Sequence, residues 1–317
     1  MGGGDRRPSW EGAPRPRALA GAPGVCVARC VLGLTVYTRH RPPAPSAGVG
    51  ALLRAFLEVA PVEALTLFRT SLLDAWRRLE DGDLAAIVRL VANDEGGGAA
   101  RHLFSFHLAD GPHAPEVFFH YREVDEGRGV GAGYVQLGLP LDTAPEHLFQ
   151  LALQASHATP LWCGAAGFAV SAHPVEVDTS LSAAWAWCKR HHGLDVQDPE
   201  RARHHASRGL PCFNWLTLVD DALAEAAGFA APPPDPAAVA LDVQWLRTPR
   251  GVVVRAGAAP TLGDVNGLRP CEAYGCAAAQ LAPLLPAPLP RWGGRFWEGE
   301  QSERWHRRFA EPEGWSS

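Results

Sequence analysis

Residues 213–228 read FNWLTLVDDALAEAAG, and this stretch has the most regular apolar periodicity in the chain. Its apolar residues recur at intervals of three and four, which is the spacing of one face of an α-helix. They are Trp215, Leu218, Val219, Ala222, Leu223 and Ala226. Asn214 is placed to cap the first turn, and Gly228 is placed to end the last one. The pattern predicts a helix over 214–228 that is buried against a sheet.

Helical and extended patterns alternate along the rest of the chain without a regular strand–helix–strand rhythm. Extended segments are predicted at 25–38, 65–69, 102–109, 116–124, 133–139 and 161–170, and helices at 49–57, 84–91, 145–155, 181–192 and 271–282, with a shorter helix from Asp198. Residues 239–257 predict a hairpin, because Pro249 and Gly251 stand where a type I turn favours them. This order favours an α+β fold in which several helices pack on an antiparallel or mixed sheet.

Composition divides the chain into three parts. Residues 1–24 are rich in glycine, proline and arginine, and we expect a disordered N-terminal arm there. Residues 25–290 are expected to form the α+β domain, with a candidate subdomain boundary at the proline-rich segment 231–238. Residues 291–317 form a C-terminal tail rich in aromatic residues and arginine.

Charge and residue usage exclude several function classes. The formal net charge of -5 argues against general nucleic-acid binding, which favours a basic surface, and suits a basic protein partner instead. Lys189 is the one lysine in the sequence, and its context matches neither a phosphate-binding loop nor a Schiff-base site. The seven cysteines contain no CxxC pair, which indicates reduced thiols. We find no signal peptide or membrane-spanning segment, and we expect a cytoplasmic protein without a cofactor.

Three polar motifs fail the tests for ligand binding. The run GRGVGAG at 127–133 breaks the dinucleotide-binding spacing and lies between two extended segments, which predicts a hairpin loop. Asp264 and Asn266 begin like a calcium loop, but the later ligand positions are wrong, so a tight turn between Gly263 and Gly267 is expected. His107, Asp110 and His113 match no standard metal spacing, and we expect an ordinary turn beyond a strand end.

A run of cysteines and histidines is the strongest candidate for chemistry. Its members are Cys188, His191, His192, His204, His205 and Cys212. His191 and His192 stand before Gly193 in the last turn of a predicted helix, where cationic residues complement the helix dipole. Three arginines near His204 and His205 would oppose a divalent cation. We therefore favour a structural role, with a metal-dependent hydrolase using this stretch as the alternative.

Several separated motifs carry a resemblance to a known family. They are LSAAWAWCKRHHGLDVQDPE (181–200), GLPCFNWLTLVDDAL (209–223), GVVVRAGAAPTLGDVN (251–266) and RWHRRF (304–309). In this order they resemble the type VI secretion immunity protein family, formerly a domain of unknown function, and the resemblance covers most of residues 25–310.

The resemblance implies a protein that is not an enzyme. Such proteins are encoded beside toxic effectors and bind them, and several of the associated toxins look like nucleases, which would place the antidote in the cytoplasm. It implies a cognate effector as partner, with no direct nucleic-acid or membrane contact. The motif residues Asn214, Trp215, Gly257, Gly263, Asp264 and Asn266 all have architectural explanations as cap, core or turn, so the effector interface stays unassigned. An accessory component of the secretion machinery is a further alternative.

Overall fold

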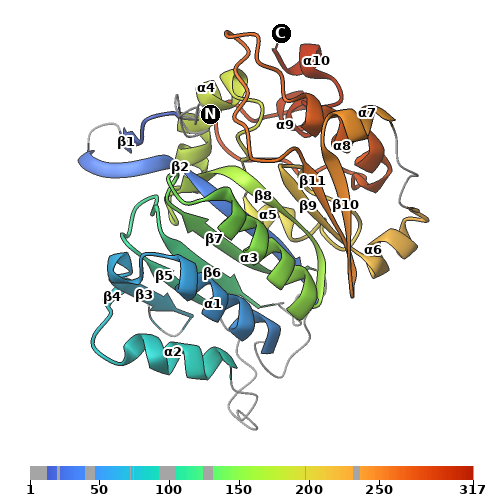
Figure 1. Ribbon diagram of the computed structural model, residues 1–317. Helices are drawn as coiled ribbons and strands as arrows, with labels where there is room; N and C mark the ends of the chain where they lie inside the picture. Colours follow the sequence, from blue (N-terminus) through green and yellow to red (C-terminus); the bar gives the residue numbers. More distant parts are fainter. Residues whose placement is uncertain are drawn as a thin grey trace, which may run out of the picture.

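One antiparallel sheet runs through the molecule (Figure 1). The computed structural model describes residues 13–19, 22–39, 47–71, 73, 75–92, 105–123, 131–196, 198–230 and 236–316. The strands are β1 (Arg17–Leu19), β2 (Ala22–Thr38), β3 (Leu67–Thr70), β4 (Arg77–Arg78), β5 (Ser105–Ala109), β6 (Phe118–Arg122), β7 (Gly133–Leu139), β8 (Leu161–Ala172), β9 (Leu216–Asp220), β10 (Val243–Thr248) and β11 (Gly251–Ala256). Their order is β10-β11-β9-β8-β2-β7-β6-β5-β3-β4, and β1 pairs with β2.

Helices cover this sheet. They are α1 (Ala47–Val59), α2 (Asp83–Ala92), α3 (Pro145–Ala158), α4 (Val177–Arg190), α5 (Pro199–Ala202), α6 (Asp221–Ala226), α7 (Pro236–Ala240), α8 (Glu272–Leu281), α9 (Glu300–His306) and α10 (Pro312–Ser316). Figure 1 shows α1 and α3 lying across the sheet on the side that faces the viewer. On that face Phe56 of α1 meets Phe119 of β6, with ring centroids 5.5 Å apart. The architecture confirms the α+β class.

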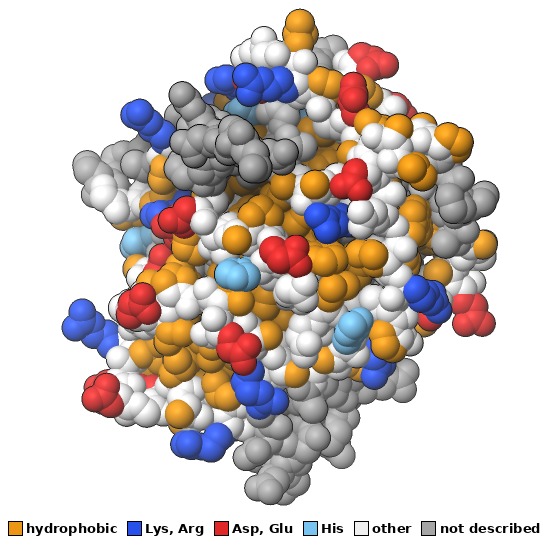
Figure 2. All heavy atoms as spheres, in the orientation of Figure 1, with side chains coloured by type: hydrophobic (Ala, Val, Ile, Leu, Met, Phe, Trp, Pro, Cys, Tyr) orange, Lys and Arg blue, Asp and Glu red, His pale blue; other side chains and the backbone are white. Residues whose placement is uncertain are grey.

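Apolar and charged groups are interspersed on the side of the molecule where α1 and α3 cover the sheet. Figure 2 shows acidic and basic side chains scattered among apolar ones there, without a field of one sign. Within the described residues, no helix is both long enough and apolar enough to cross a membrane.

Most predicted elements are confirmed. The segment 133–139 is β7, and the helices predicted near 49–57 and 145–155 are α1 and α3. The hairpin predicted over 239–257 is formed by β10 and β11, and Thr248 pairs with Gly251 across its turn.

The prediction of a helix over 214–228 is wrong. Leu216–Asp220 is the strand β9, paired with β8 and β11, and only Asp221–Ala226 is helical. Asp220 rather than Asn214 caps that helix, because its Oδ1 accepts the amide N–H of Ala222 at 2.9 Å. All five residues of β9 are buried, so the strand lacks the alternation that marks a half-exposed strand.

The terminal and linking segments also contribute to the sheet and core. Within the expected N-terminal arm, Arg17–Leu19 pair with β2, and residues 1–12 lie outside the described residues. β11 follows the 231–238 segment yet pairs with β9, which precedes it, and β10 pairs with β11, so one sheet includes strands from both sides. Four tryptophans of the 291–317 tail are buried: Trp292, Trp297, Trp305 and Trp315.

Candidate functional site

Asn214 and Trp215 fasten the start of β9 to neighbouring strands. The Asn214 Nδ2 donates to the carbonyl of Phe168 at 3.0 Å, and its Oδ1 accepts the Trp215 amide at 2.7 Å. A Cβ on Gly167 would lie 2.3 Å from the Asn214 Oδ1, so only glycine at position 167 leaves room for the side-chain amide of Asn214. The Trp215 indole donates to the carbonyl of Gly257 at 2.9 Å. Both motif residues therefore hold main-chain segments together.

The 262–270 loop forms a turn that hydrogen bonds within the loop and from α4 hold in place. The Asp264 Oδ1 accepts the amide N–H of Asn266 at 3.1 Å, which confirms the predicted turn. Arg190 of α4 donates two hydrogen bonds to the Asp264 carboxylate, at 3.1 and 2.9 Å. These bonds hold the pKa of Asp264 far below its ordinary value. Gly263 has φ +63°, and a Cβ there would lie 2.7 Å from the sulfur of Cys271. The loop is shaped by its own residues and by α4.

The first half of the cysteine–histidine run ends α4. Cys188 is fully buried, and burial raises the pKa of its thiol. The His191 Nδ1 donates to the carbonyl of Gly263 at 2.8 Å. Burial, followed by the charge of Arg308, lowers the pKa of His192 to about 4. These residues connect the end of α4 to the 262–270 loop and to the C-terminal tail.

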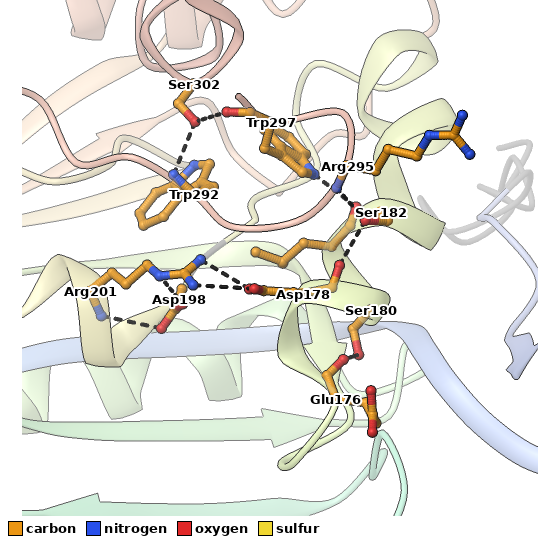
Figure 3. Close-up of polar contacts among 11 residues, drawn as sticks. Glu176, Asp178, Ser180, Ser182, Asp198, Arg201, Trp292, Arg295, Trp297 and Ser302 are labelled. Carbon is orange, nitrogen blue, oxygen red and sulfur yellow. Dashed lines mark hydrogen bonds and ion pairs between the residues drawn. The ribbon is translucent and has the colours of Figure 1, made fainter. Parts of the chain in front are cut away.

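His204 and His205 belong to a different place, a surface cleft of about 380 Å³ beyond α5. The cleft is lined by Arg201, His204, His205, Pro288, Leu289 and Arg291. The His205 Nδ1 donates to the carbonyl of Pro288 at 3.0 Å. Figure 3 shows that Arg201 reaches from α5 to Asp178 of α4, and the two hydrogen bonds measure 3.0 and 3.3 Å. Asp198 also lies 3.4 Å from the Arg201 Nε. One of the two arginines that line the cleft, Arg201, is therefore already paired.

The six residues of the run do not converge on one centre. Among the described residues, no group of three or more His, Cys, Asp and Glu side chains could hold a metal ion. Cys212 is 2 % exposed, and burial raises the pKa of its thiol well above the ordinary value. Buried, protonated thiols are poor nucleophiles and poor metal ligands. The geometry supports a structural role for this stretch.

A buried arginine that the sequence did not single out lies at the centre of this region. Arg308 is 1 % exposed and lies 3.7 Å from the carboxylate of Asp195, which is equally buried. Its guanidinium donates to the carbonyls of His192 at 2.8 Å and Phe213 at 3.3 Å. It also lies over the Trp305 ring, 3.7 Å from the centroid. Only the fold reveals this arginine, because several exposed arginines surround it in the sequence.

The three polar residues of the 107–113 segment have separate surroundings. His107 lies on β5 and stacks on His120 of β6, with centroids 4.5 Å apart. Asp110 accepts the amide N–H of Glu116 at 3.1 and 3.2 Å. The His113 Nδ1 lies 2.6 Å from the His173 Nε2. Of the run GRGVGAG, residues 127–130 lie outside the described residues.

Comparisons with known proteins agree with this scaffold. A model of a protein family described as "TsiV: Type VI immunity for VRR-NUC" matches residues 99–309, about two thirds of the chain. No curated protein matches. The solved structure of the Pseudomonas aeruginosa T6SS protein PA0821 is similar, with a TM-score of 0.71 and 17% identity over 92% of this chain and 88% of that one. At this identity the likeness concerns the fold. The family match shows that the chain belongs to the type VI immunity family for VRR-NUC, as the resemblance implied.

Proposed function

We propose that this immunity protein neutralises a nuclease effector of a type VI secretion system. It binds the effector reversibly and covers a surface that the effector needs for nucleic acid, without catalysing a reaction. It does so in the cytoplasm, where a nuclease of the same cell would meet its substrate.

The observation that carries this proposal is the extent of the family match. The match runs from before β5 to Phe309, and so includes the strands from β5 to β11 and most of the C-terminal tail, but not β2 at the centre of the sheet. The family description names VRR-NUC as the target of the immunity, which supports the nuclease class. The net charge of -5 suits a nuclease partner, because a protein surface that holds nucleic acid is basic and opposite charges speed association.

The surroundings of the reactive side chains support an inhibitor that acts by binding. Cys188 and Cys212 are buried with raised pKa values, and His191 and His205 each donate a ring N–H to a main-chain carbonyl. These groups are occupied in holding the fold. A binding inhibitor needs a shaped surface instead of a reactive centre.

Co-expression with the neighbouring toxin gene tests the proposal. A bacterial host that carries the induced toxin alone should stop growing and lose its chromosomal DNA. The same host should grow when this protein is co-expressed, and the two proteins should copurify as a stable complex. Growth arrest and DNA loss that persist at full expression of this protein would refute the proposal.

A further inference from the structure

A row of polar side chains crosses four strands of the sheet. Arg69 of β3 pairs with His107 of β5, His107 pairs with His120 of β6, and His120 pairs with Gln136 of β7. Residues directly opposite each other on neighbouring strands point to the same face. The side chains of Arg69, His107, His120 and Gln136 therefore form one line, which we call the cross-strand row.

The row lies on the face opposite α1. The alternate residues of the same strands, among them Phe106 and Phe119, are buried on the α1 side. Members of the row are only half-buried. Aromatic rings adjoin them: Trp76 packs on His107 with centroids 4.9 Å apart, and Tyr134 meets His120 edge-on at 5.1 Å. The row thus reaches solvent within an apolar frame.

The polar atoms of this face are poorly satisfied within the chain. The His107 Nε2 and the Arg122 Nε are buried and have no hydrogen-bond partner. Arg69, His120 and Gln136 form no hydrogen bond or ion pair with another side chain or carbonyl in the described part of the chain. Buried nitrogen atoms in native proteins are nearly always paired, so the two unpaired ones on this face, the His107 Nε2 and the Arg122 Nε, indicate a missing partner.

The charge of this face indicates the chemistry of that partner. Burial lowers the pKa of His120 to about 3 and that of His107 well below its ordinary value, with Arg69 adding to both effects. The positive charge at neutral pH therefore comes from Arg69 and Arg122. The described carboxylate nearest to Arg122 is Glu200, which pairs with it at 2.9 Å and lies at the edge of the face. Arg69 has no such partner among the described carboxylates. On a chain with a net charge of -5, this face is locally basic.

We propose that the cross-strand row is the docking surface for an acidic segment of the effector, whose carboxylates contact the Arg69 guanidinium and the ring N–H of His120. The inference rests on the proposed function and names one contact of that complex, apart from the effector's basic nucleic-acid surface. Arginine and imidazole N–H groups donate charge-assisted hydrogen bonds to carboxylates, and Gln136 adds a neutral amide donor. The partly dehydrated surroundings strengthen such bonds relative to bonds at a fully exposed surface.

Introducing a negative charge into the row tests the proposal. The variants are Arg69→Glu and His120→Glu, with Arg69→Lys to keep the charge and Arg54→Glu as the matched control. Arg54 is exposed on α1, on the other side of the sheet. The probe is the purified toxin domain encoded by the neighbouring gene, and its dissociation constant is measured by isothermal titration calorimetry. Circular dichroism and thermal unfolding confirm that each variant folds.

We expect each glutamate introduced into the row to weaken binding by about tenfold or more, whereas Arg54→Glu and Arg69→Lys bind within about threefold of the wild type. Wild-type affinity in both folded glutamate variants of the row would overturn the docking surface and leave the proposed function intact. If the wild-type protein itself fails to bind the toxin domain, both proposals fall. A single-stranded oligonucleotide that binds the wild type at physiological salt and is released by Arg69→Glu would also overturn the inference, because the row would then recognise nucleic acid.

Discussion

Replacing Arg308 with alanine removes the cation that links the C-terminal tail to the core. The wild-type guanidinium contacts two separate parts of the chain: the segment after α4, through the carbonyl of His192 and the carboxylate of Asp195, and the carbonyl of Phe213. It also lies between two rings, 3.7 Å from the centroid of Trp305 and 4.1 Å from that of Phe309.

The expected loss is large because the partners stay buried. Removing one member of a buried ion pair costs about 3–5 kcal/mol, since the other charge is left uncompensated. The two main-chain carbonyls also lose their donor, at about 1 kcal/mol each. The ring contacts contribute up to about 2 kcal/mol when they are dehydrated. These effects overlap, so we expect a decrease of about 4–6 kcal/mol in the free energy of unfolding.

The neighbouring Arg307 provides the control. Its side chain is 46% exposed and pairs with Glu303 and Glu311 on the same surface. Arg307→Ala should cost less than about 1 kcal/mol, because exposed ion pairs contribute little. The assay is urea unfolding of the wild type and both variants, followed by tryptophan fluorescence. Equal losses in Arg308→Ala and Arg307→Ala would refute the claim that the buried arginine holds the tail to the core.

Three further outcomes follow from the packing. Trp315→Ala should lower the free energy of unfolding by about 3–5 kcal/mol in the same assay, because the buried indole donates to the carbonyl of Cys188 at 3.0 Å; a loss below about 1 kcal/mol would contradict this. Gly193→Ala should cost about 1–3 kcal/mol, because the added Cβ would lie 1.9 Å from the carbonyl oxygen of Thr261, and an unchanged melting temperature would show that the contact is not rigid. Burial lowers the pKa of His306 to about 3, so the unfolded chain takes up a proton first and the fold loses stability as pH falls below about 6.5. His306→Phe should therefore reduce the fall in melting temperature between pH 7 and pH 5. A fall as steep as that of the wild type would contradict the assignment to His306.

Periodicity predicted most of the fold, and its one clear failure has a physical cause. Both faces of β9 are covered. Its first four residues therefore include only one polar side chain, that of Thr217, beside Leu216, Leu218 and Val219. A helix then begins directly at Asp221. A continuous apolar strand followed directly by a short helix can show the same apolar spacing as one longer helix. Only the pairing of β9 with β8 and β11 distinguishes the two structures.

The candidate surface could not be predicted from the sequence, because it depends on strand register. Arg69, His107, His120 and Gln136 come from four strands, and a shift of one residue in any pairing would turn its side chain to the other face. In the sequence, His107 belongs only to a group with Asp110 and His113 that matches no standard metal spacing. By contrast, the turn at Asp264 is local, and the residues that shape it stand side by side in the sequence.

The most direct test of the inhibitory role is a titration of the nuclease activity that we propose for the cognate toxin. The purified toxin is held at a fixed concentration far above the dissociation constant, and this protein is added in small steps while plasmid cleavage is measured. Our account predicts a linear loss of activity that reaches zero at a fixed stoichiometry, with activity recovered once the complex is dissociated and the toxin is refolded alone. Complete loss at a small fraction of that stoichiometry, with no recovery, would show a catalytic mode of neutralisation. Full cleavage at a large excess of this protein would contradict the inhibitory role altogether.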